Sequence, residues 1–213
     1  MGSRSPLRLL ALLFLAAFPI ARLHAQVLEF ESGGLKYKAL TRGGVTIMFA
    51  PLPTKVLGYA ILQVAISNGS PVSWSFKPED FRFEREGGRQ IQAVSAGTVV
   101  KQLLDHASRG DVGRLISAYE GALFGNAQVH STNGYEERRQ DYLALGSTKL
   151  KAASAASAIA LVTTKLAPGQ STDGAVFYPS RGKALGAGRL IVDAAAERFE
   201  FPVEAEAQSR ASR

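Results

Sequence analysis

The sequence predicts a mainly β protein, an antiparallel β-sandwich that is interrupted by a block of two to three helices. Apolar and polar residues alternate with a period of two in several segments before residue 97, and again from residue 163 to residue 204. Between these parts, residues 97–162 carry apolar residues at helical spacing. The strands are short and separated by turn residues rather than by single helices, which favours an antiparallel sandwich over a parallel sheet.

The strands before residue 97 differ in how many of their faces are apolar. In residues 58–68, Ile61 and Ala65 make the second face only partly polar, which predicts a central strand. The next two strands carry these residues on single faces: Val72, Trp74 and Phe76, then Phe81 and Phe83. The segment Asn68–Pro71 precedes the first of these two strands and is expected to form a turn, although it also has the pattern of a glycosylation sequon.

The helical block is expected to begin near Gly97. Asp111 is placed to cap a second helix, and a third stretch runs from about residue 135 to residue 160, with Gly146 as a break. The Ala/Ser-rich part "KAASAASAIALV" permits close helix packing, and it equally fits a linker. The block either packs on the sandwich or projects from it. In the alternative organisation, two consecutive folding units share a strand.

The first 25 residues have the order of a secretory signal. Arg4 and Arg8 precede the apolar run Leu9–Ala21, and small residues end the segment at Ala25. The run is shorter than the roughly 20 residues that a spanning helix needs. We expect cleavage after Ala25, with a cut after Ala21 or an uncleaved anchor as alternatives. The remaining chain is then exported to the periplasm or the extracellular space, with no integral membrane segment.

These boundaries divide the chain into five parts. They are a signal peptide at 1–25, the first part of the sandwich at 26–96, the helical insertion at 97–162, the second part of the sandwich at 163–204, and a disordered tail at 205–213.

The composition excludes several kinds of site. The chain has no cysteine, so it has no disulfide, no thiolate nucleophile and no Cys-ligated metal. The leader carries three of the basic residues, which lowers the net charge of the rest by three units from the +7 of the whole chain. The remaining excess is spread along the sequence. That is a weak basis for binding nucleic acid or anionic lipid, so no nucleic-acid partner is expected.

Two stretches resemble secreted bacterial immunoglobulin-like domains of the telokin-like type. The first is "SNGSPVSWSFKPEDFRFEREGG" and the second is "LAPGQSTDGAVFYPS". The resemblance covers about half of the chain after the leader, and it implies an immunoglobulin-like sandwich and an exported protein. Both motifs are turn-and-strand signatures without catalytic content. The helical insertion is a departure from the pattern of that family.

Few residues have the patterns of a catalytic or ligand-binding site. Only His106 and His130 follow the leader, so a three-histidine metal site is excluded, and the glycines form no phosphate-binding motif. We therefore expect no cofactor, no metal and no catalytic residue. The candidate partner-binding residues are Tyr135, Arg138, Arg139 and Tyr142, because Tyr and Arg are the types that anchor interfaces.

The sequence thus favours an exported, non-enzymatic module that binds another protein or an envelope component, with the helical insertion as its recognition element. A sandwich from which residues 97–162 are deleted is expected to stay folded. The alternative is a secreted hydrolase with a site between sandwich and insertion that uses His106 or His130. A third hypothesis is a protease inhibitor that presents a loop. The oligomeric state is left open.

Overall fold

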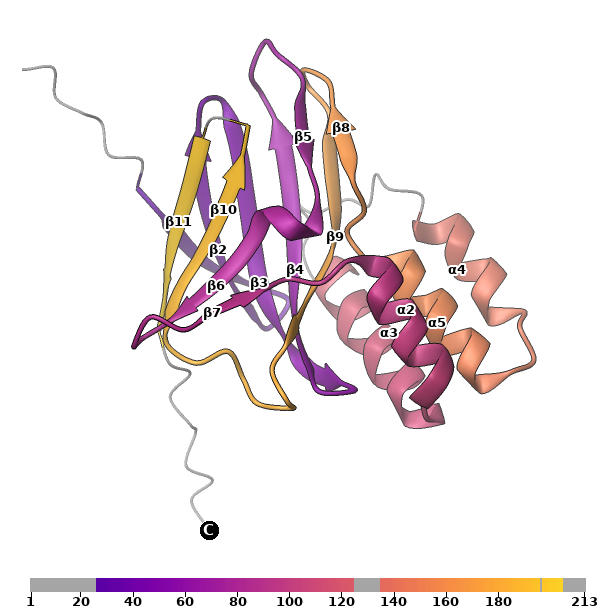
Figure 1. The fold of residues 1–213 in the computed structure, drawn as a ribbon. Coiled ribbons are helices and arrows are strands. Elements are labelled where there is room, and N and C mark those ends of the chain that lie inside the picture. Colours follow the sequence, from indigo (N-terminus) through magenta and orange to yellow (C-terminus); the bar gives the residue numbers. More distant parts are fainter. Residues whose placement is uncertain (1–25, 125–134, 196, 205–213) are drawn as a thin grey trace, which may run out of the picture.

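The computed structural model describes residues 26–124, 135–195 and 197–204. It confirms a mainly β fold with a helical insertion, arranged in three layers (Figure 1). The strands are β1 (Leu28–Ser32), β2 (Leu35–Arg42), β3 (Val45–Val56), β4 (Tyr59–Asn68), β5 (Trp74–Phe76), β6 (Phe81–Arg85), β7 (Gln90–Gln92), β8 (Thr164–Leu166), β9 (Ser171–Pro179), β10 (Gly188–Ala194) and β11 (Glu197–Val203). The helices are η2 (Pro78–Asp80), α2 (Ala96–His106), α3 (Arg109–Phe124), α4 (Tyr135–Leu143) and α5 (Thr148–Ile159).

Two main sheets face each other, and every pair of neighbouring strands in them is antiparallel. The larger sheet has the order β1-β2-β3-β4-β9, and the smaller one has the order β11-β10-β6-β7. Strands β5 and β8 form a separate two-stranded ladder. The helices α2 to α5 lie on the side of the larger sheet that faces away from the smaller sheet (Figure 1).

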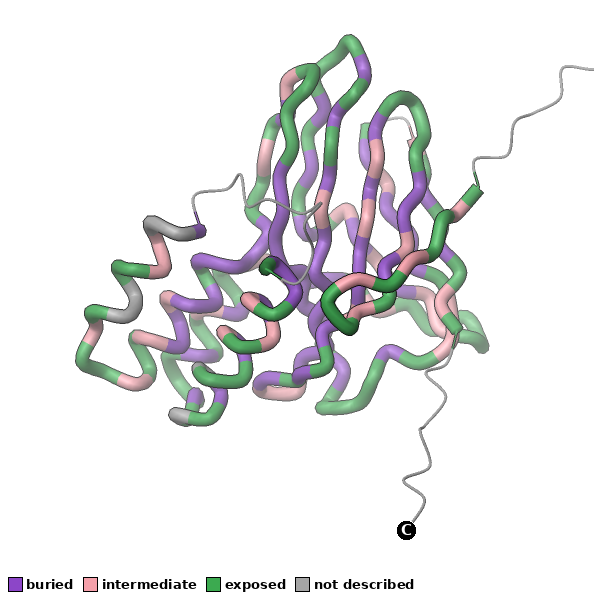
Figure 2. Tube along the Cα trace, turned by 180° about the vertical axis from the view of Figure 1, so that it is seen from behind, coloured by how far each residue is buried: buried purple, intermediate pink, exposed green. Residues whose placement is uncertain are grey.

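Strand β4 lies inside the larger sheet, between β3 and β9, as its only partly polar second face predicted, and its residues divide between two cores. Leu62 and Val64 belong to the core between the sheets, together with the aromatic residues of β6 and β11. Ile61 belongs to a second core, between the larger sheet and the helices. Figure 2 shows buried positions on both sides of this sheet. The helical block therefore packs on the sandwich and covers an apolar face.

Helix α5 is the centre of the helical layer. Its buried residues are Ala152, Ala153, Ala155, Ala156, Ala158 and Ile159, and it packs against α2, α3 and α4. Alanine side chains are small enough for helices to approach closely, so a low-complexity stretch forms the most enclosed helix. The linker interpretation of "KAASAASAIALV" is therefore wrong. Gly146 does separate α4 from α5, so the expected third helix is two helices.

Two helix starts show how polar side chains satisfy the first backbone N–H groups. Ser95 accepts a hydrogen bond from Thr98 N (3.3 Å) at the start of α2. Asp111 is not the cap of α3 but lies in its first turn, where its carboxylate accepts hydrogen bonds from the N–H and hydroxyl of Ser108 (both 2.8 Å). Burial alone would raise the pKa of Asp111, but the bonds from Ser108 and from Arg114 hold it below its usual value.

The chain returns from the helical layer to the sheet through a close contact with β9. Ala160 forms a bridge with Ala175, and Leu161 N donates to Ala175 O (2.9 Å). A Cβ atom on Gly174 would lie 2.6 Å from the Cα atom of Leu161, so only glycine fits at this position. The return segment is therefore fixed to the edge of the larger sheet.

The opening of β5 differs from the sequence prediction at one residue. Trp74 and Phe76 are buried as expected, but Val72 is 58% exposed. The strand begins only at Trp74, because Val72 still belongs to the preceding turn, where its carbonyl oxygen accepts a hydrogen bond from Asn68 Nδ2 (2.8 Å). Turn residues do not follow the period of two that places strand side chains.

Candidate functional site

The predicted partner-binding residues lie on α4, where three of them hold this helix to its neighbours. Tyr135 is 0% exposed, its ring centroid is 5.0 Å from that of Tyr119, and its hydroxyl donates to Glu120 Oε1 (2.9 Å). Arg139 forms an ion pair with the same Glu120 carboxylate, and Arg138 Nη2 donates to Ala158 O (2.8 Å). The side chain of Tyr142 lies outside the described residues. Partner binding by this set stays a prediction.

A second group of polar side chains joins the helical layer to the larger sheet. On β9, Asp173 is 2% exposed, and its Oδ2 accepts a hydrogen bond from Tyr119 (2.6 Å) of α3. The hydroxyl of Tyr37 lies 2.8 Å from Gln63 Oε1 and 3.3 Å from Ala122 O, which links β2, β4 and α3. Buried polar groups without partners are costly, so such contacts fix where α3 sits on the sheet.

The hydrolase hypothesis uses His106 or His130, and only His106 lies among the described residues. His106 is the last residue of α2 and is exposed, as suits a basic group at a helix C-terminus. His130 lies outside the described residues. Among the described residues, no three His, Asp or Glu side chains are grouped closely enough to hold a metal ion.

The outer side of the helical layer exposes apolar side chains close to charged ones. Leu104 of α2 is 37% exposed and Leu150 of α5 is 47% exposed. The two leucines flank a contact between their helices, in which Lys149 Nζ donates to Asp105 O (2.8 Å). In α2, Val99 and Leu103 are the buried residues, whereas Leu104 lies on the more exposed side of the helix. We call these two exposed leucines, with Asp105 and Lys149 next to them in the sequence, the Leu104/Leu150 patch.

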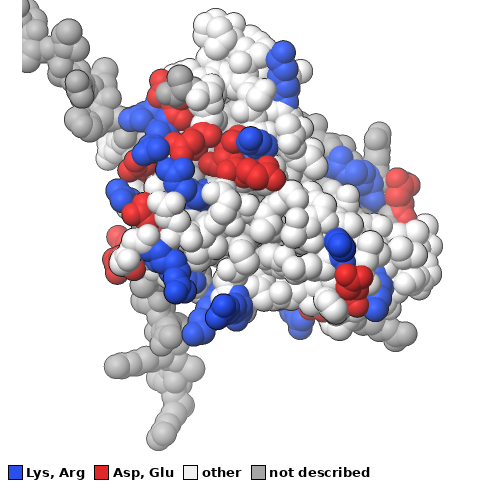
Figure 3. Space-filling model, viewed as in Figure 1, with Lys and Arg blue, Asp and Glu red and all other residues white. Residues whose placement is uncertain are grey.

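The outer face of the smaller sheet is covered by charges that pair with one another. Figure 3 shows red and blue side chains interleaved there. Asp193 pairs with Arg82 and with Arg198, while Arg189 pairs with Glu84 and Glu200. Burial raises the pKa of Asp193, but the two arginines more than offset this and hold it below its usual value. A surface whose charges are mutually neutralised offers little net attraction to a charged partner.

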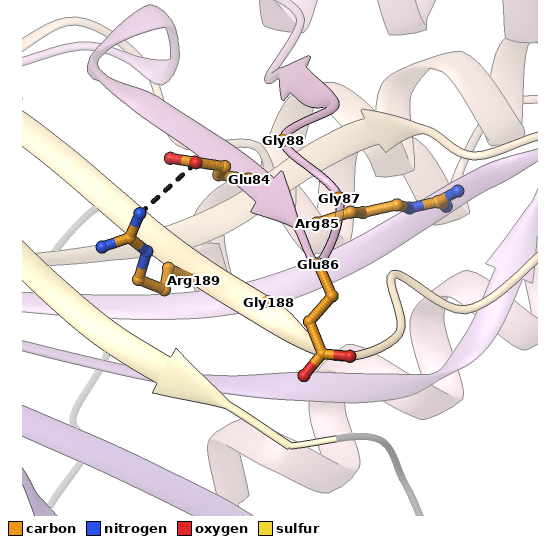
Figure 4. Close-up of a pocket in the computed structure, with 7 residues that line it drawn as sticks. All are labelled: Glu84, Arg85, Glu86, Gly87, Gly88, Gly188 and Arg189. Carbon is orange, nitrogen blue, oxygen red and sulfur yellow. Dashed lines mark hydrogen bonds and ion pairs between the residues drawn. The ribbon is translucent and has the colours of Figure 1, made fainter.

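A shallow hollow lies beside the β6–β7 hairpin. Figure 4 shows its lining of backbone glycines and mixed charges, with Glu84 and Arg189 paired across it. Gly188 allows the close approach of β10 to β6 here, because a Cβ atom at this position would lie 2.1 Å from Glu84 O. The hollow is therefore a consequence of tight strand packing, and its lining charges have both signs.

Comparisons with protein-family models, with curated proteins and with solved structures found no match for this chain. Within the described residues, no helix is long and apolar enough to cross a membrane. Function is therefore inferred from the surfaces of the molecule, and the outer side of α2 and α5 is the candidate site.

Proposed function

We propose that the protein is an exported, non-enzymatic binding module, an immunoglobulin-like sandwich whose helical layer recognises another protein or a component of the cell envelope. The signal-like leader supports export, and the two-sheet antiparallel architecture supports the resemblance to secreted immunoglobulin-like domains. The observation that carries the proposal is the exposed pair Leu104 and Leu150 on a helical layer that is packed firmly against the sheet.

Exposed large apolar side chains on neighbouring elements are typical of protein interaction sites, which combine an apolar centre with a polar rim. Here the rim is supplied by Asp105 and Lys149, whose mutual contact holds the ends of α2 and α5 together. The sheet beneath keeps both helices in place, so the patch is preorganised and loses little conformational entropy on binding. Arg138 and Arg139 are half-buried and hold α4 within the layer, because they contact Ala158 of α5 and Glu120 of α3.

Changing Leu104 and Leu150 together to serine should abolish capture of the envelope partner while leaving the protein folded. Truncation of central apolar contacts costs about 1–2 kcal/mol each, so affinity should fall at least tenfold. The measurement is chemical cross-linking in envelope extract followed by identification of the retained species, and then titration of that species by calorimetry.

The matched control is the double change Leu28→Ser and Val72→Ser, which removes from the sandwich two apolar side chains that are still more exposed. Circular dichroism should show the same helix content for both variants and the wild type. A partner that binds the Leu104/Leu150 variant as tightly as the wild type would remove this patch from the proposed function.

A further inference from the structure

One end of the sandwich is formed by three segments that hydrogen bonds tie together. The β3–β4 turn and the β9–β10 loop meet where Gly58 O accepts bonds from Ser180 N (2.9 Å) and Gly182 N (3.1 Å). The β6–β7 hairpin joins them through Glu86 N, which donates to Ala187 O (3.1 Å), and through Arg85 Nη2, which donates to Ala184 O (3.4 Å). We call these three connected segments the loop end.

The loop end gathers basic side chains that are far apart in the sequence. They are Lys55, Arg85, Arg89, Arg181 and Lys183. All are exposed except Arg85, which is half-buried. None of them lies within ion-pair distance of a carboxylate in the described part of the chain, whereas the arginines of the smaller sheet's outer face are paired. The acidic residues at this end are Glu86, Glu204 and Glu84, of which Glu84 pairs with Arg189, so a positive excess remains.

Figure 3 shows the same contrast, since blue side chains gather below the interleaved red and blue band on the sandwich. Charges that are not neutralised by neighbours produce a field that attracts an anionic partner. Basic residues that are spread along the sequence are therefore not spread over the surface, because the fold brings five of them to one end.

The shape and chemistry of this end indicate what kind of anion fits. The basic residues are spread over three loops rather than around a groove, and the lining of the adjacent hollow includes Glu84 and Glu86. The three segments are residues 53–58, 84–90 and 180–187, and their sequences contain no Trp, Tyr or Phe. Single-stranded nucleic acid is usually held by aromatic stacking, for which these loops have no side chains. A broad surface of phosphate groups fits them better.

We propose that the loop end docks the protein on a bilayer that contains anionic lipids. The attraction is electrostatic, with about a fivefold gain in affinity for each basic residue that reaches the head groups. This docking surface is separate from the Leu104/Leu150 patch, so the helical layer stays free to bind its partner while the sandwich rests on the membrane. Because the attraction acts between exposed charges, it weakens as salt shortens the Debye length from about 10 Å at 0.1 M.

The test is co-sedimentation of residues 26–213 with vesicles, since the apolar run of the leader would itself bind lipid. Two kinds of vesicle are compared at low and high salt. One is pure phosphatidylcholine, and the other also contains about 30% phosphatidylglycerol, which makes its surface negative. We expect binding only to the anionic vesicles and its loss at high salt. The double variant Arg89→Glu/Lys183→Glu should bind at least tenfold more weakly than the wild type.

The matched control is Lys101→Glu/Lys165→Glu, which makes the same charge change at exposed lysines on α2 and β8 and should bind like the wild type. If the glutamate variant does not fold, Arg89→Gln/Lys183→Gln tests the same point. The proposal is overturned if the wild type does not bind or if it binds both vesicle types equally. It is also overturned if the Lys101/Lys165 control variant loses as much binding as the Arg89/Lys183 variant. Binding to a DNA oligonucleotide without binding to vesicles would also overturn it.

Discussion

Changing Asn68 to aspartate should lower the free energy of unfolding by about 3 kcal/mol or more, the largest effect that we expect from a single substitution. Asn68 is 0% exposed, and every hydrogen-bonding position of its amide is used. Its Nδ2 donates to Val72 O (2.8 Å) and Leu166 O (3.0 Å), and its Oδ1 accepts from Ser70 N (3.0 Å) and Ser70 Oγ (2.6 Å).

The aspartate side chain has nearly the same shape, but an ionised carboxylate has no hydrogen to donate. One of its oxygens would therefore face the carbonyl oxygens of Val72 and Leu166, and a buried charge would have no cationic partner. The same site positions Trp74, whose Nε1 donates to Ser70 Oγ (2.9 Å). We expect the fluorescence emission of Trp74 to shift to the red and the midpoint of urea unfolding to move to a lower urea concentration.

The control is Gln90→Glu, which makes the same amide-to-acid change at an exposed residue of the edge strand β7. Its effect should be within about 0.5 kcal/mol of zero, as is usual for surface substitutions. Equal stability of the Asn68→Asp protein and the wild type would contradict the role of Asn68 as the residue whose hydrogen bonds hold the turn before β5. Since its side chain is buried, Asn68 also offers no accessible amide nitrogen for a glycan.

Deleting residues 97–162 should yield an aggregating chain rather than the folded sandwich that the sequence led us to expect. The deletion uncovers the sheet residues of the second core, which are Leu52, Val56, Tyr59, Ile61, Ala175 and Phe177. Each large apolar side chain contributes about 1.5–3 kcal/mol when it is buried. Their summed loss is comparable with the 5–15 kcal/mol that stabilises a whole domain. Size-exclusion chromatography and dye binding to exposed apolar surface measure the outcome.

A second deletion chain tests the cause. It carries Leu52→Thr, Ile61→Thr and Phe177→Thr, which make the uncovered face more polar while keeping residues that favour strands. This chain should be more soluble than the simple deletion if exposure of the face is responsible. A simple deletion that is monomeric and keeps the native emission of Trp74 would instead show that the helices are dispensable for folding.

The strand pattern of the sandwich followed from the sequence because burial in a sheet leaves a local signal. The two-faced character of residues 58–68 predicted that β4 lies inside the sheet, and the single apolar face of Phe81 and Phe83 predicted that β6 borders the core between the sheets. Apolar residues at helical spacing predicted the helices α2 and α3 in the same way. Asp111 lies in the first turn of α3 rather than at its cap, because the helix begins at Arg109, and acidic residues are favoured at both positions.

The contacts between elements could not be predicted, because they depend on which faces meet. Nothing local marks Gln63 or Asp173 as partners of tyrosines on other elements, nor shows that Tyr135 points inward. The Tyr/Arg set on α4 therefore looked like a surface, although Tyr135 is buried and both arginines contact neighbouring helices. For the same reason the loop end, whose basic residues come from separate loops, was invisible as a charge cluster in the sequence.

The central claim is that the helical layer and the sandwich fold as one unit, which makes the layer a rigid platform for recognition. Equilibrium urea unfolding with two probes tests it most directly, because Trp74 is the only tryptophan and reports on the sandwich, while circular dichroism at 222 nm reports on the helices. Coincident transitions indicate a single cooperative unit. We predict that the two midpoints coincide. A loss of helical signal at a lower urea concentration, with Trp74 emission still native, would contradict the account.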